Sequence, residues 1–220
     1  TRFSTVTGVQ TCALPILYIF CNPHNPGGRV WEKEILEKIG RLCQQHGVIL
    51  VSDEIHQDLT FFGNKHCSFN TVSPDFKDFT LILSSATKTF NIAGTKNSYV
   101  VVENPKLRKK FQQRQLANNH HEVSSLGFLA TEAAYRYGKP WLIELKAVLE
   151  DNIDFVVAYF SQHAPSLKVM KPQGTYLIWL DFSAYNLTDE ELFQILRQKA
   201  KVVLSTRSEE RRVGKECRSR

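Results

Sequence analysis

The sequence predicts an α/β fold with a mainly parallel sheet. Short aliphatic runs at residues 17–21, 48–52 and 80–83 are typical of buried strands. Residues 31–46 lie between the first two runs and have the apolar spacing of an amphipathic helix. Strand, helix and strand in this order indicate a parallel βαβ unit. Polar residues follow each run, at the edge where parallel sheets bind their ligands.

Start and stop signals define the first helix and the segments after it. The apolar face of the helix predicted over 31–46 consists of Ile35, Leu36, Ile39, Leu42 and Cys43. Gly47 stands at the C-terminal cap position. Residues 57–79 are rich in loop formers, and residues 99–102 predict a further strand. The Asn-Pro pair at 104–105 predicts the start of a helix, because Asn caps helices and proline is tolerated in the first turn.

The second half of the chain is predicted to be mostly helical. Helices are expected over residues 125–137, 141–163 and 188–200. A strand is expected over 175–180, and residues 188–191 have the pattern of a capping box. The long helix that ends near residue 163 is expected to lead into a second domain. We therefore expect a large domain over 17–145 and a small one that begins within 146–206.

Composition indicates a globular protein with a sizeable core. Apolar residues form 42% of the 220 residues, with three Trp and fourteen Phe. No apolar run is long enough to span a membrane, so we expect no membrane partner. The five cysteines show neither a paired framework nor metal-ligand spacing, which predicts reduced thiols and a cytoplasmic location.

The two ends of the chain are expected to be non-native. Residues 1–16 and 207–220 contain segments that resemble translated sequencing-library adapters, without periodicity that joins them to their neighbours. The first segment carries one net positive charge and the second carries three, so the formal charge of +6 falls to +2 for the remainder. The basic tail is therefore no reason to expect a nucleic-acid partner, and we expect none.

Chemically useful side chains follow the three predicted strands. Lys88 stands among small and hydroxylated residues, where desolvation would free its amine for nucleophilic work, although a solvated loop lysine is the plainer interpretation. Asp53 follows the second strand, where it either points into a ligand crevice or is a helix cap or a surface acid. Asn25 lies in a Pro- and Gly-rich loop that fits a plain turn as well as a ligand loop, and one of its two Asn-Pro bonds is a candidate for the cis form. Together a lysine, a carboxylate and an amide suit pyridoxal phosphate.

Four motifs in order carry a resemblance to a known family. They are Asn22-Pro23-His24-Asn25-Pro26-x-Gly28-Arg29-Val30-Trp31, Ser52-Asp53-Glu54-Ile55-His56, Ser85-Ala86-Thr87-Lys88-Thr89-Phe90-Asn91-Ile92-Ala93-Gly94 and Gly174-Thr175-Tyr176-x-x-Trp179-Leu180-Asp181. With them, residues 17–206 resemble the fold-type I pyridoxal-phosphate enzymes, the aspartate aminotransferase superfamily. The likeness is greatest to its cystathionine β-lyase-like C–S lyases of the MalY/PatB kind. It implies an incomplete pyridoxal-phosphate transferase-like large domain and the start of a small α+β domain.

The resemblance implies a role for each matching residue. Lys88 is similar to the lysine that forms the Schiff base with the cofactor and moves protons. Asp53 resembles the partner of the pyridine nitrogen, and Asn25 the donor to the ring's phenolic oxygen. His56 stands where many relatives have a tyrosine beside that oxygen.

Two further residues match positions that contact the cofactor phosphate in relatives. They are Ser85 and Lys96, and Lys96 also fits a surface lysine. The family implies an amino-acid substrate and a homodimer. Relatives extend further at both ends, where they supply an aromatic ring over the cofactor and an arginine for the substrate carboxylate, and we expect both parts to be absent here.

The implied activity is that of a C–S β-lyase, which cleaves a sulfur amino acid such as cystathionine to a thiol, pyruvate and ammonia. A class I/II aminotransferase would share every residue named above, and a non-catalytic truncated product is the alternative outside the enzymes. A Ser-x-x-Lys hydrolase is set aside, because no Ser-Asp-Asn or Lys-Thr-Gly follows Ser85 and Lys88. No metal is expected, because residues 120–122 lack the spacing of a His-Glu-x-x-His site.

Overall fold

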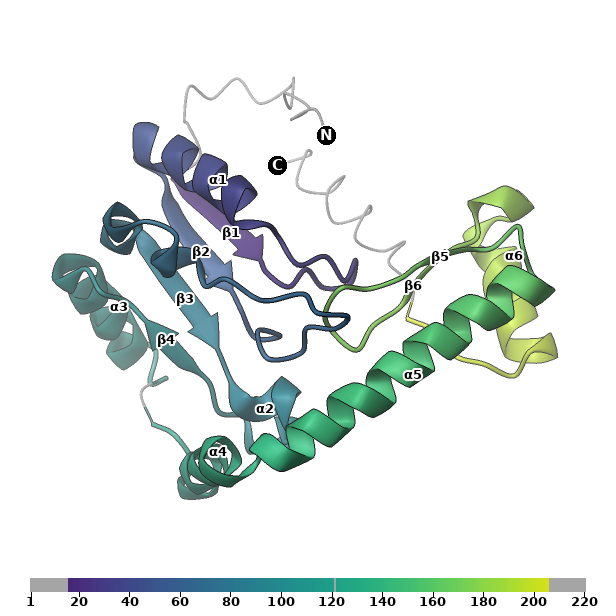
Figure 1. Ribbon diagram of the computed structural model, residues 1–220. Coiled ribbons are helices and arrows are strands. Elements are labelled where there is room, and N and C mark those ends of the chain that lie inside the picture. Colours follow the sequence, from purple (N-terminus) through teal and green to yellow (C-terminus); the bar gives the residue numbers. More distant parts are fainter. Residues whose placement is uncertain (1–15, 121, 206–220) are drawn as a thin grey trace. The chain divides into compact units, whose positions relative to one another are not determined.

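The computed structural model describes residues 16–120 and 122–205, so the expected non-native segments lie outside it except for residue 16. Its four-stranded sheet has the order β1-β2-β3-β4, with the bounds Leu17–Cys21, Ile49–Asp53, Thr80–Ser84 and Tyr99–Val101. β1, β2 and β3 are parallel, as predicted, and β4 is antiparallel to β3. The fold is therefore α/β with a mixed sheet (Figure 1).

The described residues also form helices and a small second sheet. The α-helices are α1 Lys33–Gln45, α2 Ala86–Thr89, α3 Pro105–Ala117, α4 Ser125–Tyr137, α5 Lys139–His163 and α6 Asp189–Gln194. Short 3₁₀ helices are η1 Phe69–Thr71, η2 Pro74–Asp78, η3 Ala93–Thr95 and η4 Ser183–Tyr185. The second sheet pairs β5, Lys168–Met170, with β6, Trp179–Asp181.

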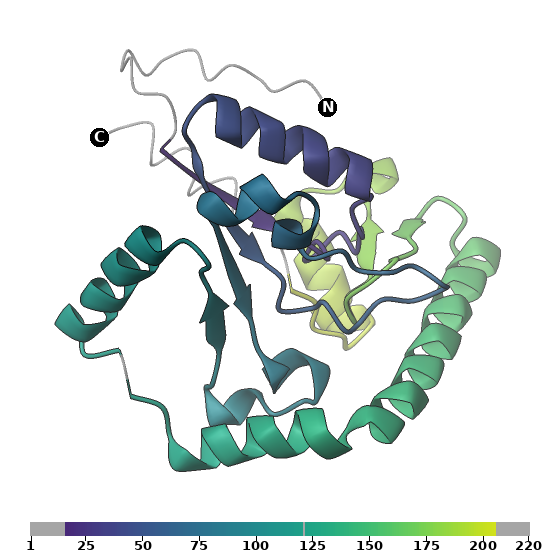
Figure 2. The same ribbon diagram turned by 60° about the vertical axis from the view of Figure 1, so that its left-hand side comes forward.

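One core lies between α1 and the face of the sheet that this helix covers (Figures 1 and 2). Its buried members are Phe20, Leu36, Cys43, Val48, Leu50, Phe69, Phe76 and Ile82. Of the predicted apolar face of α1, Leu36 and Cys43 are buried, whereas Leu42 is 48% exposed. Gly40 faces Phe76 so closely that an added Cβ would lie 2.2 Å from two of the ring carbons. A residue without a side chain is therefore needed for α1 to approach this ring.

A second core joins α5 to the segment after β2. Leu59 and Phe61 from that segment pack with Ile153 of α5, and all three are buried. Glu150 reinforces the contact, because its Oε1 accepts a hydrogen bond of 2.7 Å from the backbone N–H of Phe62. The residues that follow the carboxyl end of β2 are thus held by a long helix.

Helix boundaries follow the predicted capping signals closely. The side chain of Asn104 accepts hydrogen bonds from the first backbone N–H groups of α3, and α4 has the predicted bounds. α5 starts at Lys139, two residues before the prediction, because Pro140 fits the first turn of a helix. The capping box between Thr188 and Glu191 is confirmed, although α6 ends at Gln194 and continues as a π-helical turn.

The strand predicted over 175–180 is wrong in its first part. Its residues before Trp179 do not belong to β6. Instead, Thr175 donates its backbone N–H to the Leu59 carbonyl at 2.8 Å, and the Gln173 carbonyl accepts from Phe61 at 2.8 Å. Thr175 also has a φ of 68°, which interrupts an extended strand.

The chain divides into two compact units, one ending at Leu180 and one beginning at Asp181. The expected domain boundary at 145/146 falls inside α5 and stays a prediction. Among the described helices, none combines the length and the hydropathy that a membrane span requires.

We predict that Gly40→Ala destabilises the fold. Alanine is favoured over glycine inside a helix by about 1 kcal/mol, but the clash with the Phe76 ring opposes this gain, and overpacking costs about 1–3 kcal/mol. Urea denaturation should therefore show a lower free energy of unfolding. Gly94→Ala is the control, because nothing lies within 4 Å of its added Cβ. A Gly40→Ala chain as stable as the unchanged one would contradict this packing.

Candidate active site

The carboxyl edge of the parallel strands brings the predicted site loops together. Cys21, Asp53 and Leu83 stand side by side in the sheet register, near the ends of β1, β2 and β3. Asn25 lies in the loop after β1, and Lys88 lies in α2, directly after β3. Figure 1 shows the three arrowheads directed to the same edge of the sheet. The topology thus places an amide, a carboxylate and an amine on adjacent loops.

The loop after β1 is fixed by Asn22, whose side chain is 1% exposed. Its Oδ1 accepts from the Trp31 backbone N–H at 3.1 Å, and its Nδ2 donates to the Cys67 carbonyl at 3.3 Å. Its own backbone N–H donates to the Asp53 carbonyl at 3.0 Å. Both Asn-Pro bonds of this loop are cis. The loop that carries Asn25 is therefore anchored to the end of β2.

The same loop packs against the Gly174-Thr175-Tyr176 motif. Gly28 has a φ of +68°, and an added Cβ would lie 2.4 Å from Pro172, so no other residue fits. The Gly28 carbonyl accepts hydrogen bonds from Gln173 and Gly174. Two motifs that are far apart in the sequence thus form one structure.

His56, Lys88 and Asp53 are close enough to influence each other electrostatically. The His56 ring is 1% exposed. Burial lowers the pKa of His56, the positive charge of Lys88 lowers it further, and the negative charge of Asp53 partly opposes both. Tyr176 lies edge-on to the imidazole, with ring centroids 5.3 Å apart. The neutral form of His56 is therefore favoured at neutral pH, and both the amine and the carboxylate act on it.

Several polar groups at this edge lack a partner among the described residues. Lys88 is half-buried, and its amine makes no hydrogen bond or ion pair with a described residue. Neither ring nitrogen of the buried His56 has a partner among those residues. The Ser84 hydroxyl is also buried without one. Asp53 forms no ion pair there, and its Oδ1 accepts from the Ile55 backbone N–H at 3.2 Å. Buried polar groups normally find partners, so this cluster fits a site for a polar ligand.

Ser85 and its neighbours hold the short helix that carries Lys88. The Ser85 Oγ accepts from the Thr87 backbone N–H at 3.0 Å and contacts the Thr87 hydroxyl and the Asn97 carbonyl. Thr89, which is fully buried, donates its hydroxyl to Asp58 Oδ2 at 2.9 Å. Lys88 thus stands between Thr87 and Thr89, which are both held by hydrogen bonds. The bond from Thr89 to Asp58 joins α2 to the segment that follows Asp53.

Lys96 directly precedes Asn97, whose carbonyl accepts a hydrogen bond from the Ser85 hydroxyl. It is exposed, has a φ of 48° and follows η3. It lines a cavity of about 360 Å³ beside β4 and α3, which none of the other five predicted residues lines.

The residues described here contain no group of His, Cys, Asp and Glu that could hold a metal ion. The pattern at 120–122 falls partly outside the described residues.

Several contacts that shape the site do not follow from the sequence motifs. Tyr176 belongs to a motif named above, but its edge-on contact with His56 joins two distant segments, and the Asp58–Thr89 contact joins two loops. Glu54 belongs to a quoted motif, but its burial follows from contacts with residues 12 and 15 positions later. The sequence signal for a buried Glu54 is its place as a second acidic residue beside Asp53, directly after an aliphatic strand.

We predict that an NMR pH titration places the midpoint of His56 below its ordinary value of 6.5. Lys88→Met should raise the midpoint, because it removes a repelling charge, and Asp53→Asn should lower it further. His56→Asn assigns the resonance. A midpoint that Lys88→Met leaves unchanged would show that the amine is not close to the imidazole.

The same depressed pKa has a consequence for stability. The unfolded chain binds the His56 proton more readily than the folded chain does. The contribution of neutral His56 is therefore fully present above pH 6.5 and is lost as the pH falls toward the lowered pKa. Unfolding free energies measured across this range should decline less steeply in His56→Asn.

Comparisons with known proteins identify the family of the chain. Residues 13–216 match the family model described as aminotransferase class I and II. The chain is 46% identical to cystathionine beta-lyase PatB of Bacillus subtilis over 188 residues, which cover 86% of the chain and 49% of the relative. It is 34% identical to protein MalY of Escherichia coli over 204 residues, 92% of the chain and 51% of the relative. The chain thus spans about half the length of these relatives.

Solved structures give the same result. A pyridoxal-phosphate-bound putative aminotransferase from Clostridium difficile superposes with a TM-score of 0.84 at 46% identity, covering 86% of this chain and 49% of that one. A pyridoxal-phosphate-bound C–S lyase from Staphylococcus hominis has a TM-score of 0.80 at 34% identity, with 87% and 48% coverage. The chain belongs to the aminotransferase class I and II family.

Proposed function

We propose that the chain is part of a pyridoxal-phosphate-dependent C–S β-lyase, which cleaves a sulfur amino acid such as cystathionine to a thiol, pyruvate and ammonia. The observation that carries the proposal is the meeting of Lys88, Asp53 and His56 at the carboxyl edge of β2 and β3, with an amine that has no partner among the described residues. The similarity to cystathionine beta-lyase PatB supports the reaction class.

The residues at this edge fit the cofactor. Lys88 would hold it through the amine, Asp53 would face its ring nitrogen, and Asn25 and His56 would lie beside its ring oxygen. The orphaned nitrogens of His56 and the unpaired amine match a ligand that offers both a carbonyl and a hydroxyl. When bound, pyridoxal phosphate supplies an electron sink for negative charge at the substrate Cα.

The phosphate would lie near the start of α2. Ser85 stands there, although its hydroxyl already caps the helix and contacts Asn97. A hydroxyl offers two acceptor sites and one donor, so a phosphate contact would replace one of these hydrogen bonds. Lys96, which is exposed, would supply a cation to the phosphate.

The proposed chemistry assigns proton transfer to the Lys88 amine. Lys88 would take the proton from the substrate Cα and return it later in the cycle. Thr89 and Ser85 limit the movement of α2, so the amine approaches from a fixed direction. Neutral His56 adds no second positive charge beside the amine, and the Asp53 carboxylate would keep the cofactor ring nitrogen protonated.

A class I/II aminotransferase is the second candidate. The putative aminotransferase from Clostridium difficile is as similar in sequence as PatB is, and every residue named above suits both reactions. Pyruvate formed from cystathionine without an added 2-oxo acid would favour the lyase. Strict dependence on the acceptor would favour the aminotransferase.

We also propose a cytoplasmic homodimer. The three cysteines within the described residues are free, which suits a reducing compartment. Apolar side chains on α4 and α5, among them Leu126, Phe128 and Phe155, are 63–76% exposed, and large exposed apolar surfaces favour association.

We predict that pyridoxal phosphate attaches to Lys88 of the 220-residue chain. Reduction with borohydride followed by peptide mass spectrometry should locate the cofactor on the peptide that contains Lys88. Lys88→Ala should abolish both the label and the visible absorbance of the adduct, because the attached amine is lost.

Lys109→Ala, which changes an exposed lysine of α3, should keep the label and controls for nonspecific modification. Equal labelling of several lysines, or labelling that survives Lys88→Ala, would refute Lys88 as the attachment site.

A further inference from the structure

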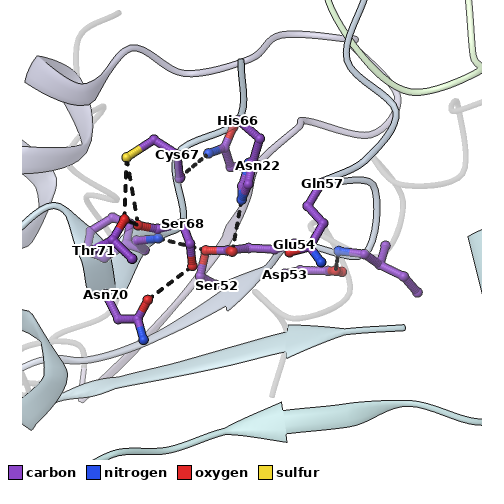
Figure 3. Close-up of polar contacts among 12 residues, drawn as sticks. Asn22, Ser52, Asp53, Glu54, Gln57, His66, Cys67, Ser68, Asn70 and Thr71 are labelled. Carbon is purple, nitrogen blue, oxygen red and sulfur yellow. Dashed lines mark hydrogen bonds and ion pairs between the residues drawn. The ribbon is translucent and has the colours of Figure 1, made fainter. Parts of the chain in front are cut away.

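The carboxylate of Glu54 is fully buried beside the candidate site (Figure 3). Its Oε1 accepts hydrogen bonds from the Ser52 hydroxyl at 3.0 Å and from the Phe69 backbone N–H at 2.8 Å. Its Oε2 lies 3.0 Å from Nε2 of His66. Burial of a carboxylate is unfavourable unless such partners replace water, so these three contacts fix the side chain in one position.

The contacts of Glu54 join the end of β2 to a distant part of the loop that follows it. His66 and Phe69 lie in the long connection between β2 and β3, and Phe69 belongs to the core under α1. Asn22 holds the same loop, because its Nδ2 donates to the Cys67 carbonyl. Glu54 is therefore held by a segment that is itself fixed to the core.

Asp53 lies on the opposite side of the strand from this cluster. Along β2, Leu50 and Ser52 are buried toward the core, while Val51 and Asp53 are half-buried on the other face. Glu54 reaches back to Ser52, and in Figure 3 the side chains of Glu54 and Asp53 extend away from each other. A Glu54 side chain that is fixed on one face therefore constrains the main chain that carries Asp53 on the other.

The Asp53 side chain has little support of its own. Within the described residues, its carboxylate accepts one backbone hydrogen bond, from Ile55, and forms no ion pair. The main chain around it is better fixed, since the Asp53 carbonyl accepts from Asn22 and the Glu54 N–H donates to Leu83 at 2.8 Å. The direction of the Asp53 carboxylate thus depends on the backbone, and Glu54 is the neighbouring side chain that anchors it.

We propose that Glu54 is a positioning residue, whose buried contacts with Ser52, His66 and the Phe69 N–H hold the Asp53 carboxylate toward the site. The purpose of this arrangement rests on the proposed function, in which Asp53 faces the cofactor ring nitrogen. The positioning itself is a property of the chain without cofactor. A residue that contributes stability alone would have no effect on the direction of the Asp53 carboxylate.

The test compares Glu54→Ala, which removes all three contacts, with Glu54→Gln, which removes the charge but keeps an acceptor for Ser52 and Phe69. Leu50→Ala is the stability control, because it removes a fully buried side chain from the same core. Each variant is also made in the Asp53→Asn background. The first readout is the NMR titration midpoint of His56 without cofactor, which reports the proximity of the Asp53 charge.

We expect the His56 midpoint to be lower in Glu54→Ala than in Glu54→Gln, because the Asp53 carboxylate moves away. The difference should disappear in the Asp53→Asn background, and Leu50→Ala should leave the midpoint unchanged. Equal midpoints in the two Glu54 variants, or a difference that persists with Asp53→Asn, would overturn the proposal. If Glu54→Ala does not fold, Ser52→Ala and His66→Ala each remove one contact and should lower the midpoint in the same direction.

The second readout is the affinity for pyridoxal phosphate, measured by absorbance titration. Glu54→Ala should weaken binding on the order of tenfold to a hundredfold, as misplacement of a site group by a lost supporting contact commonly does. Glu54→Gln should bind pyridoxal phosphate nearly as tightly as the unchanged chain does. In the Asp53→Asn background, Glu54→Ala should weaken binding no further. Weakening that is equally large in both backgrounds would contradict the role of Asp53. An unchanged chain that binds no cofactor would refute the proposed function, while the His56 comparison would still decide the role of Glu54.

Discussion

The parallel pairing of β1, β2 and β3 is the constraint on which the site depends. Because the three strands run in the same direction, with Cys21, Asp53 and Leu83 in register, the segments after them must emerge at one edge. The loop with Asn25, the end of β2 with Asp53 and the helix α2 with Lys88 therefore lie at the same edge, although they are far apart in the sequence. The core under α1 maintains this register, and α5 supports the segment after β2 from another direction.

The site is polar and only partly satisfied by the chain itself. The half-buried amine of Lys88 and the buried ring of His56 have no hydrogen-bond partner among the described residues, whereas their neighbours Thr89 and Ser85 are firmly bonded. The arrangement at His56 is unfavourable for stability alone, since a buried polar group loses water without replacement. It is favourable for a ligand that supplies the missing partners, because groups held by bonded neighbours need little reorganisation to bind it.

Sequence patterns predicted local structure well and long-range contacts poorly. The aliphatic runs and capping residues predicted the strands and most helix ends, since both depend on near neighbours. They did not predict that β4 is antiparallel, or that Thr175 leaves the strand to pair with the segment after β2. The strand ends also predicted that Asp53 and Lys88 lie at one edge of the sheet, because parallel topology alone requires it. The contacts of Glu54 with His66 and of Thr89 with Asp58 depend on the folded loops.

We propose above that Asp53 and Lys88 hold one cofactor between them. The most direct measurement is the ¹⁵N chemical shift of pyridoxal phosphate labelled at its ring nitrogen and bound to the chain at neutral pH. A protonated nitrogen is predicted in the unchanged chain, since the Asp53 carboxylate would stabilise the positive charge. The nitrogen should be unprotonated in Asp53→Ala. The same shift in both chains would contradict the account.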